Sequence, residues 1–310
     1  MNNRVYGVIG ISSVMANWNA DFSGYPKTTT KGEVFGSDKA LKYPMKKMWE
    51  ANGEKVLYIK SIKTEDGKYN PRTLEDRYEY IFGEKPNKDK SIFDVVKNLF
   101  TAIDVKNFGA TFAVSKTNIS ITGAVQIGQG FNKYCDSETQ VQSILSPFQD
   151  SKAVDKKNEE AKNTTLGTKI VSDEAHYFYP FTINPMAYNE FVHMGATEGY
   201  TEEDYNKFKE AALTSATYFA TNSKVGCENE FALFVETDCD LYLPNLDKYI
   251  EFQKGEEKNV IHVACEELLN EVSNRIQKIE IYYNPYTTVI DSIIKNITCY
   301  NIFTKQIISK

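Results

Sequence analysis

Apolar residues are clustered along the chain in a way that separates two strands from the polar segments around them. Residues 4–15 (RVYGVIGISSVM) are rich in Val and Ile, which predicts a strand buried at the centre of a sheet. Glycine and proline punctuate the polar segment 17–36, which is therefore expected to be a loop. Residues 55–59 (KVLYI) are a second strand candidate. The polar residues 63–90 are expected to lie outside the hydrophobic core.

Residues 37–50 carry the signals of a helix with two different faces. Ser37 or Asp38 can cap its start, and Pro44 in its interior predicts a kink or a new helix start. Spacings of three and four place side chains on one helical face. They predict an apolar row made of Leu41, Met45 and Met48, and a basic row made of Lys39, Lys42 and Lys46.

The clearest helical periodicity follows Ser91, which can act as the N-cap. Apolar residues recur at helical spacing at Ile92, Val95, Val96, Leu99, Phe100 and Ile103. Strands are expected next at 110–114 and 119–127. In the second strand the alternation predicts a buried face of Ile119, Ile121, Val125 and Ile127, and an outward face of Ser120, Thr122 and Gln126.

Residues 149–165 are almost wholly polar and predict an exposed projection. Thr201 and Asp204 have the spacing of a capping box at the start of a helix. The expected elements of the second half are strands at 176–181, 230–236 and 278–283, and helices at 202–220 and 262–277. Strands that alternate with helices, interrupted by long polar insertions, predict an α+β sheet with helices on one side and protruding loops.

Charge is unevenly distributed along the 310 residues, whose net charge is -6. Residues 26–49 contain six lysines and two acids, whereas residues 201–258 contain thirteen acids and six lysines. A negative net charge argues against a simple nucleic-acid-binding protein. A basic and an acidic region would suit units that stack, or a protein with one RNA face and one partner face. Lysines that only solvate an exposed surface are an equal alternative.

Several protein classes are disfavoured by what the sequence lacks. No run of about 18 apolar residues is present, so we expect no membrane span, and the first residues do not resemble a signal peptide. The cysteines are odd in number, widely spaced and without a C-x-x-C pair: Cys135, Cys227, Cys239, Cys265 and Cys299. This pattern predicts neither disulfides nor a zinc site, and is typical of a reduced, cytoplasmic protein.

Catalytic motifs are equally sparse. The histidines His176, His193 and His262 lack metal-binding spacing, and no G-x-S-x-G or phosphate-binding glycine motif is present. The acids Asp21, Glu33 and Asp38 lie near the lysine cluster and could hold a divalent ion beside a phosphate. They could equally stabilise a turn or cap a helix. We therefore expect no enzyme, no metal and no cofactor.

Three stretches, taken in order, resemble a known family. They are residues 4–49 with MANWNADFSGYPKTT and GEVFGSDKALKYPMKKMW, residues 107–133 (NFGATFAVSKTNISITGAVQIGQGFNK), and residues 164–213 with TTLGTKIVSDEAHYFYPFTINP and TEEDYNKFKEAAL. Over about residues 4–240 the chain resembles the CRISPR-associated family-seven (DevR-like) backbone proteins of type I Cascade surveillance complexes, most closely the type I-B branch. It departs from them in its first loop, ANWNADFSGYP, and in a following helix with lysines but no arginine.

The resemblance implies a modified ferredoxin-like (RNA-recognition-motif-like) palm with finger insertions and a protruding thumb. All residues 1–310 would then form one backbone-subunit domain. The implied divisions are a palm core at 1–60, 91–134 and 171–295, a finger insertion at 61–90, and a thumb at 135–170.

The same resemblance implies a non-catalytic subunit that binds CRISPR RNA. Copies would oligomerise along the guide into the helical backbone of a type I interference complex and present the guide for pairing with target DNA. The implied partners are CRISPR RNA, target DNA through the guide, other copies of the chain, and the other Cascade subunits. These last are the cap subunit at the guide 5' end, the endoribonuclease at the 3' end, and the large and small subunits.

Carried over by position, the resemblance also implies the RNA-binding residues. They are Asn17, Asn19, Lys27, Lys39, Lys42, Lys46, Lys47, Gln126, Gln129, Lys133, Thr165, Leu166 and Lys169. Lys, Asn, Gln and Thr suit contacts to phosphate and sugar, which hold a guide independently of its sequence. Leu166 would be an apolar wedge between bases.

Two alternatives remain open. Related type III backbone subunits cleave RNA with a metal and a loop acid, for which Asp21 is the candidate. A stand-alone RNA-binding protein is the other alternative, although the palm strands lack the aromatic signature that stacks bases in RNA-recognition motifs.

Overall fold

The computed structural model describes residues 1–86, 91–114, 117–149 and 163–309. A large sheet lies at the centre of the molecule, with the strand order β16-β14-β11-β1-β10-β8-β2, and β7 and β9 also pair with β10. The strands are β1 (Arg4–Ala16), β2 (Phe35–Gly36), β7 (Val125–Ile127), β8 (Gly130–Asn132), β9 (Thr139–Gln149), β10 (Asn163–Ile183), β11 (Cys227–Thr237), β14 (Ile276–Tyr283) and β16 (Ile297–Asn301).

The first strand lies at the centre of this sheet, as the sequence predicts. β1 runs antiparallel to β10, with Val5 opposite Ile183, and antiparallel to β11, with Val5 opposite Glu236. Its alternate side chains enter two different cores: Ile9 packs on the helical side of the sheet and Val8 on the other side. Both faces of the strand are therefore covered, which explains its nearly continuous apolar sequence.

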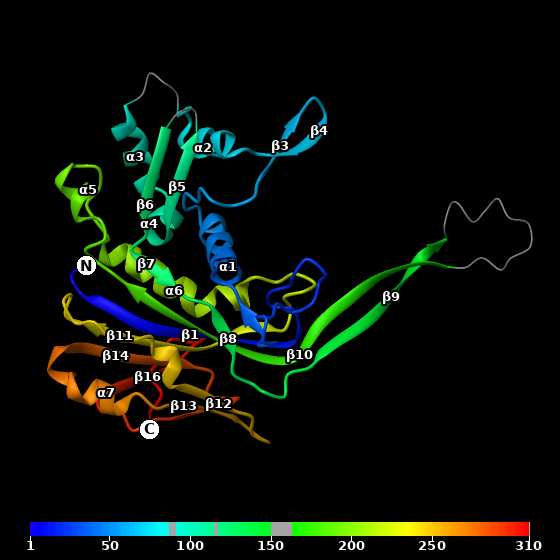
Figure 1. Cartoon of the computed structure of the whole chain (residues 1–310), viewed down its shortest axis with the longest axis vertical. Helices are drawn as coiled ribbons and strands as arrows, with labels where there is room; N and C mark the ends of the chain where they lie inside the picture. The colour runs from blue at the N-terminus through cyan, green and yellow to red at the C-terminus, as the bar shows by residue number, and fades with distance from the viewer. Residues whose placement is uncertain (87–90, 115–116, 150–162, 310) are drawn as a thin grey trace, which may run out of the picture.

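Two helices cover one face of the sheet, α1 (Asp38–Ala51) and α6 (Glu202–Tyr218), as Figure 1 shows. Both predicted N-caps are present: the Ser37 side chain accepts a hydrogen bond from the Ala40 amide, and Thr201 and Asp204 form the capping box. α1 continues through Pro44 without the new start considered above. The predicted apolar row of α1 is buried.

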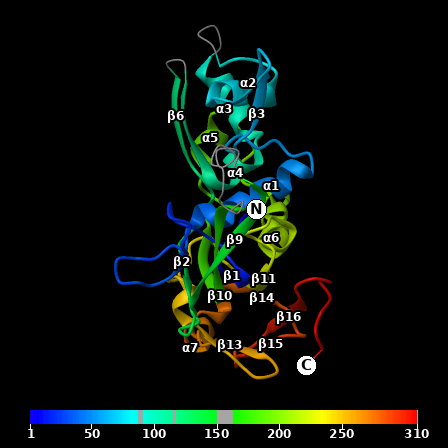
Figure 2. The same cartoon turned by 90° about the vertical axis from the view of Figure 1, so that its right-hand side faces the viewer.

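A second layer covers the opposite face, so helices are not the only cover of the sheet (Figures 1 and 2). Its parts are β12 (Ile250–Gln253), β13 (Asn259–Val263), β15 (Thr288–Asp291), η1 (Leu246–Tyr249), α7 (Glu266–Glu271) and η2 (Ser273–Arg275). The predicted helix at 262–277 is wrong: the only helical elements in this range are the short α7 and the single 3-10 turn η2. Ile261 and Val263 alternate inward on β13, which pairs with β12 and β15, and β14 already begins at Ile276.

An upper region projects beyond α1 on the side away from this second layer (Figure 2). It consists of β3 (Ile62–Glu65), β4 (Lys68–Pro71), α2 (Leu74–Phe82), α3 (Ile92–Phe100), α4 (Ile103–Phe108), β5 (Gly109–Val114), β6 (Thr117–Thr122) and α5 (Asn189–His193). β3 pairs with β4 and β5 with β6, each as a separate two-stranded sheet.

Two predictions for this region need correction. Residues 55–59 are not a strand, because the Asp104 carboxylate accepts the amides of Leu57 and Tyr58, each at 2.8 Å, in place of a neighbouring strand. The helix that begins after Ser91 ends at Phe100 and a second one starts at Ile103. Its expected apolar face is buried except at Ile92, which is 61% exposed.

The predicted strand at 119–127 is divided into β6 and β7. The division falls at Gly123, where a Cβ atom would lie 2.2 Å from the backbone of Phe108. The predicted alternation nevertheless holds on both strands, because the four apolar positions are buried and the three polar positions are exposed.

A long hairpin extends from the sheet beyond the body of the molecule (Figure 1). β10 pairs with β1 from Ser172 onwards, and before that point it pairs with β9. Most of the predicted polar projection, 150–162, lies outside the described residues.

Candidate nucleic-acid interface

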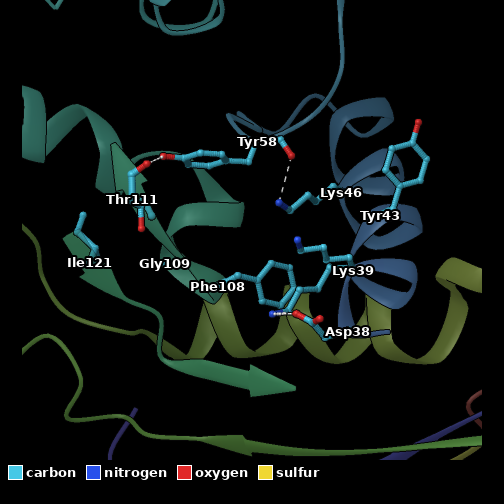
Figure 3. A pocket seen from close by; sticks show the side chains of 11 residues that line it. Asp38, Lys39, Tyr43, Lys46, Tyr58, Phe108, Gly109, Thr111 and Ile121 are labelled. Carbon is cyan, nitrogen blue, oxygen red and sulfur yellow. Dashed lines mark hydrogen bonds and ion pairs between the residues drawn. The ribbon is translucent and has the colours of Figure 1, made fainter. Parts of the chain in front are cut away.

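The basic row of α1 faces a hollow of about 660 Å³ beside the upper region (Figure 3). Three predicted RNA-binding residues, Lys39, Lys42 and Lys46, line it together. Asp38 and Tyr43 of α1 also line it, and the rest of the lining comes from elements farther along the sequence: Tyr58, Phe108, Gly109, Ala110, Thr111 and Ile121. We call this hollow the lysine pocket.

The lysines face the pocket because the opposite row of the helix is buried. Leu41 and Met45 are 0% exposed and pack in the core under α1. Side chains at spacings of three and four then project together from the other side of the helix. The end of α4 and the β5–β6 hairpin form the facing wall.

The three ammonium groups differ in how many contacts they make with other groups of the chain. Lys39 is exposed and has no ion-pair partner in the described part of the chain. The Nζ atom of Lys42 lies 2.9 Å from the Asp38 carboxylate and 5.0 Å from the centre of the Phe108 ring. Lys46 donates to the Tyr58 carbonyl at 3.1 Å and lies 3.5 Å from the buried Asp104 carboxylate.

Burial lowers the pKa of Lys46, although the nearby Asp104 carboxylate opposes this effect. Lys46 therefore mainly holds the pocket wall together, whereas Lys39 and Lys42 are better placed for an anionic ligand. Tyr58 belongs to the same wall: its hydroxyl donates to the Thr111 carbonyl at 2.8 Å. Burial and the Asp104 charge raise the pKa of Tyr58 to about 12, so its hydroxyl stays protonated.

The aromatic residues of the pocket were not among the predicted site residues. Tyr58 and Phe108 come from a loop and from a helix end that only the tertiary structure brings to α1. Tyr43 is 40% exposed and packs edge-on against Phe219. A positive surface with aromatic rings between the cations is typical of proteins that bind single-stranded nucleic acid.

Other predicted residues near α1 have structural contacts and lie outside this pocket. Lys47 pairs with Glu50 at 2.9 Å, and the pocket lining does not include it. The Asn17 amide, 4% exposed, donates to the carbonyls of Gly24 and Ile170. Asn19 accepts the Ser37 amide at 2.8 Å and so fixes the entry into α1.

A second group of predicted residues lies at the β2 edge of the sheet. The Lys27 ammonium lies 5.6 Å from the centre of the Phe35 ring. Lys133 lines a separate hollow of about 450 Å³ together with Phe131 and Asp247. This edge is connected to the lysine pocket through Ser37, where β2 leads into α1.

The glutamines lie beside this edge. Gln126 is exposed on β7 and donates to the Gly123 carbonyl at 2.8 Å. Gln129 is exposed between β7 and β8. Neither residue lines the lysine pocket.

The remaining predicted residues lie on the hairpin. Lys169 is half-buried on β10 opposite Gln142 of β9. Thr165 pairs with Leu145 in the backbone register, whereas the side chains of Thr165 and Leu166 lie outside what the structure describes. The hairpin residues thus stand apart from the lysine pocket.

The three candidate acids each have a local partner. One Asp21 oxygen accepts the amides of Ser23 and Tyr25, which is the turn role considered above. Glu33 accepts the Thr29 hydroxyl, and Asp38 pairs with Lys42. Among the described residues no group of three or more His, Cys, Asp or Glu side chains is arranged to hold a metal ion. A search of the same residues finds no helix long and apolar enough to cross a membrane.

A family model and chains of solved structures are similar to this chain. The family model described as CRISPR-associated protein Cas7 matches residues 3–272. A chain of a solved structure entitled "CRISPR RNA-guided surveillance complex, pre-nicking" has a similar fold, with a TM-score of 0.53, 13% identity and 96% of each chain covered. A chain from a "CRISPR RNA-guided surveillance complex" gives a TM-score of 0.45 at 13% identity, covering 89% of this chain and 88% of that chain. A search of curated proteins finds no match.

Proposed function

This chain belongs to the CRISPR-associated Cas7 family, and we propose from that premise that it is a guide-RNA-binding backbone subunit of a type I surveillance complex. In this proposal the chain has no catalytic role of its own. Copies of it coat the guide RNA and leave the bases free to pair with target DNA. The guide cap subunit, the 3'-end endoribonuclease and the large and small subunits are its proposed partners. The type I-B assignment stays a prediction.

The lysine pocket is the observation that carries this proposal. Lys39 and Lys42 present positive charge beside the Phe108 ring in an open hollow. Ammonium groups bind phosphate regardless of the base attached to it, as a subunit that accepts any guide sequence requires. Among the predicted residues, Lys39 and Lys42 are therefore the ones we expect to contact the RNA backbone first.

The order of the central elements supports a ferredoxin-like palm. Along the chain the sequence is β1, α1, β7, β10, α6, β11, and in the sheet the order is β11, β1, β10, β7, with neighbouring strands antiparallel. This is the β-α-β-β-α-β arrangement, with both helices packed on one face. We propose that residues 1–60, the part of 91–134 that follows Thr122, and much of 171–295 form this palm.

The two projections support the proposed thumb and fingers. The β9–β10 hairpin, paired from Thr139 to Ser172, nearly coincides with the predicted thumb at 135–170 and extends away from the sheet (Figure 1). This suits a thumb that contacts a neighbouring stretch of RNA. The β3–β4 hairpin and α2 fall within 61–90. We extend the finger region to Thr122, because β5 and β6 form their own sheet beside α2 and α3.

Coating by several copies explains how a chain with a net charge of -6 can hold RNA. A subunit with a few phosphate contacts binds weakly and loses affinity as the salt concentration rises. Neighbouring copies that also contact one another raise the effective concentration of each copy on the same RNA. The acidic segment 201–258 can then face protein partners instead of RNA.

The test is to express the chain, purify it at low salt, and extract and size the nucleic acid that accompanies it. We expect RNA of mixed sequence in particles far larger than 35.3 kDa, which shrink after ribonuclease treatment. If the chain stays free of RNA even when the neighbouring genes are co-expressed, the proposed function is wrong.

Lys42→Gln and Lys47→Gln provide a matched comparison in this experiment. Both lysines lie on α1, and each pairs with a carboxylate at 2.9 Å, but only Lys42 lines the pocket. We expect the Lys42 variant to retain less RNA than the Lys47 variant. Equal retention would contradict the placement of the guide in the lysine pocket.

A further inference from the structure

Two phenylalanines lie side by side on the short strands β8 and β2, of which β2 forms the edge of the sheet. Phe35 pairs with Phe131, and Gly36 pairs with Gly130. The centres of the two rings are 6.0 Å apart, and Phe131 is 37% exposed. The Lys27 ammonium lies 5.6 Å from the centre of the Phe35 ring.

The paired glycines force the rings to the outer side of the sheet. Tyr179 is fully buried against the inner side of both strands, where its hydroxyl accepts the Trp18 indole N–H. A Cβ atom on Gly130 would lie 2.4 Å from the Tyr179 ring, and one on Gly36 would lie 1.8 Å from its hydroxyl. Since side chains alternate along a strand, the residues next to these glycines must face outward.

We infer that Phe35, Phe131 and Lys27 form a stacking platform for a base of a bound single-stranded RNA. This inference rests on the proposed function and adds a base-contacting site to it. Exposed aromatic rings stack on bases of any identity, and a neighbouring cation can hold the adjoining phosphate. β2 ends at Gly36 and α1 begins at Asp38, so the platform is joined along the chain to the helix that carries the lysine pocket. Its rings face the opposite side of the sheet, the side of Phe178 and the second layer.

Contacts around the platform favour this ligand over an added protein strand. Phe35 donates its amide to the Lys27 carbonyl at 2.9 Å, so the loop of the same chain already occupies the outer edge of β2 there. The nearest acid of the loop, Glu33, is engaged with Thr29. Lys27 has no carboxylate partner within the described residues, and its charge complements a phosphate.

The test compares single-stranded RNA binding by the full chain and by the Phe35→Leu/Phe131→Leu variant. Leucine keeps the surface apolar but removes the ring faces. We expect affinity to fall about tenfold, within the range of one stacked base. The slope of log affinity against log salt should not change, because no phosphate contact is lost. Tyr286→Leu, at a residue that is 71% exposed in the turn between β14 and β15, is the control and should bind like the unmodified chain.

A second measurement does not depend on any variant. RNA with abasic positions should bind the unmodified chain more weakly than normal RNA of the same length, whereas the double leucine variant should bind both equally. The platform is wrong if the unmodified chain binds abasic and normal RNA equally well. It is also wrong if the double variant binds normal RNA as tightly as the unmodified chain does. Neither result would contradict RNA binding in the lysine pocket.

Two further outcomes are decisive. Normal affinity together with smaller oligomers of the double variant would assign the rings to contacts between copies and overturn the base platform. If the unmodified chain binds no RNA at all, the proposed function and the platform are both contradicted.

Discussion

The Nδ1 atom of His176 lies 2.9 Å from each carboxylate oxygen of Glu230, and both side chains are buried. The other ring nitrogen of His176 lies 3.0 Å from Glu174, which also accepts hydrogen bonds from Lys254. The Phe252 ring stacks on the imidazole with a centroid distance of 3.7 Å. This cluster joins β10 and β11 of the main sheet to β12 of the second layer.

The cluster predicts that stability depends on pH. Burial alone would lower the pKa of His176, but the Glu230 and Glu174 carboxylates outweigh burial and raise it above the usual 6.5. A raised pKa in the folded state means that the protonated ring stabilises the fold below pH 6.5. We therefore expect the free energy of unfolding to fall as the pH rises from 6.5 through the raised pKa, as measured by denaturant titration.

His176→Gln should flatten this part of the pH profile, because the variant has no charge to lose. His193→Gln, at an exposed position on α5, is the control and should keep the slope of the unmodified protein. Identical slopes for the His176 variant and the unmodified protein would show that this histidine is not the titrating group.

The lysine pocket predicts a change in the salt dependence of RNA binding. Lys42→Gln removes one cation at the pocket, so the slope of log affinity against log salt should decrease by about 0.7, the value of one contact on a single strand. Filter binding at several salt concentrations measures this slope. The slope for Lys47→Gln should equal that of the unmodified chain. If Lys47→Gln lowers the slope as much as Lys42→Gln does, the lysine pocket is not the preferred phosphate-binding site.

Gly130→Ala is expected to destabilise the fold by about 1–3 kcal/mol, since the added Cβ atom would overlap the buried Tyr179 ring. Thermal unfolding measures this effect. Gly167→Ala is the comparison, because there the Cβ atom would meet only Ile144 at 3.7 Å, an ordinary contact. Equal melting temperatures for the two variants would contradict the close packing of β8 on Tyr179.

Asp104→Ala is expected to cost about 3–5 kcal/mol of stability, because it leaves two amides without an acceptor and the half-buried Lys46 ammonium without its counter-ion. The carboxylate now accepts the Leu57 and Tyr58 amides and lies 3.5 Å from the Lys46 ammonium. Chemical denaturation gives the free energy, and Asp136→Ala at an exposed position should leave it nearly unchanged. A loss below about 1 kcal/mol, an ordinary hydrogen bond, would show that water replaces the carboxylate.

The helix α1 shows which structural features could be predicted from the sequence. Its cap at Ser37, its buried row and the common direction of Lys39, Lys42 and Lys46 all follow from helical spacing, and the structure confirms them. These features are local, since each depends on residues within a few positions. The family was also recognisable from the sequence, because its stretches occur in a fixed order.

What the sequence could not predict depends on distant residues. KVLYI at 55–59 has the composition of a strand, yet the side chain of Asp104 takes the place of a partner strand. Phe108 and Tyr58 reach the lysine pocket only because the upper region folds over α1. The Phe35–Phe131 pair requires the β2–β8 register, which no spacing along the chain indicates.

The strand β10 belongs both to the centre of the sheet and to the projecting hairpin. Its residues from Ser172 to Ile183 are hydrogen-bonded to β1, and its earlier residues are bonded to β9 without any break in the strand. A force applied to the hairpin therefore acts along one continuous backbone that is anchored beside β1. A pull on the hairpin is therefore transmitted directly to the hydrogen bonds between β10 and β1 at the centre of the sheet.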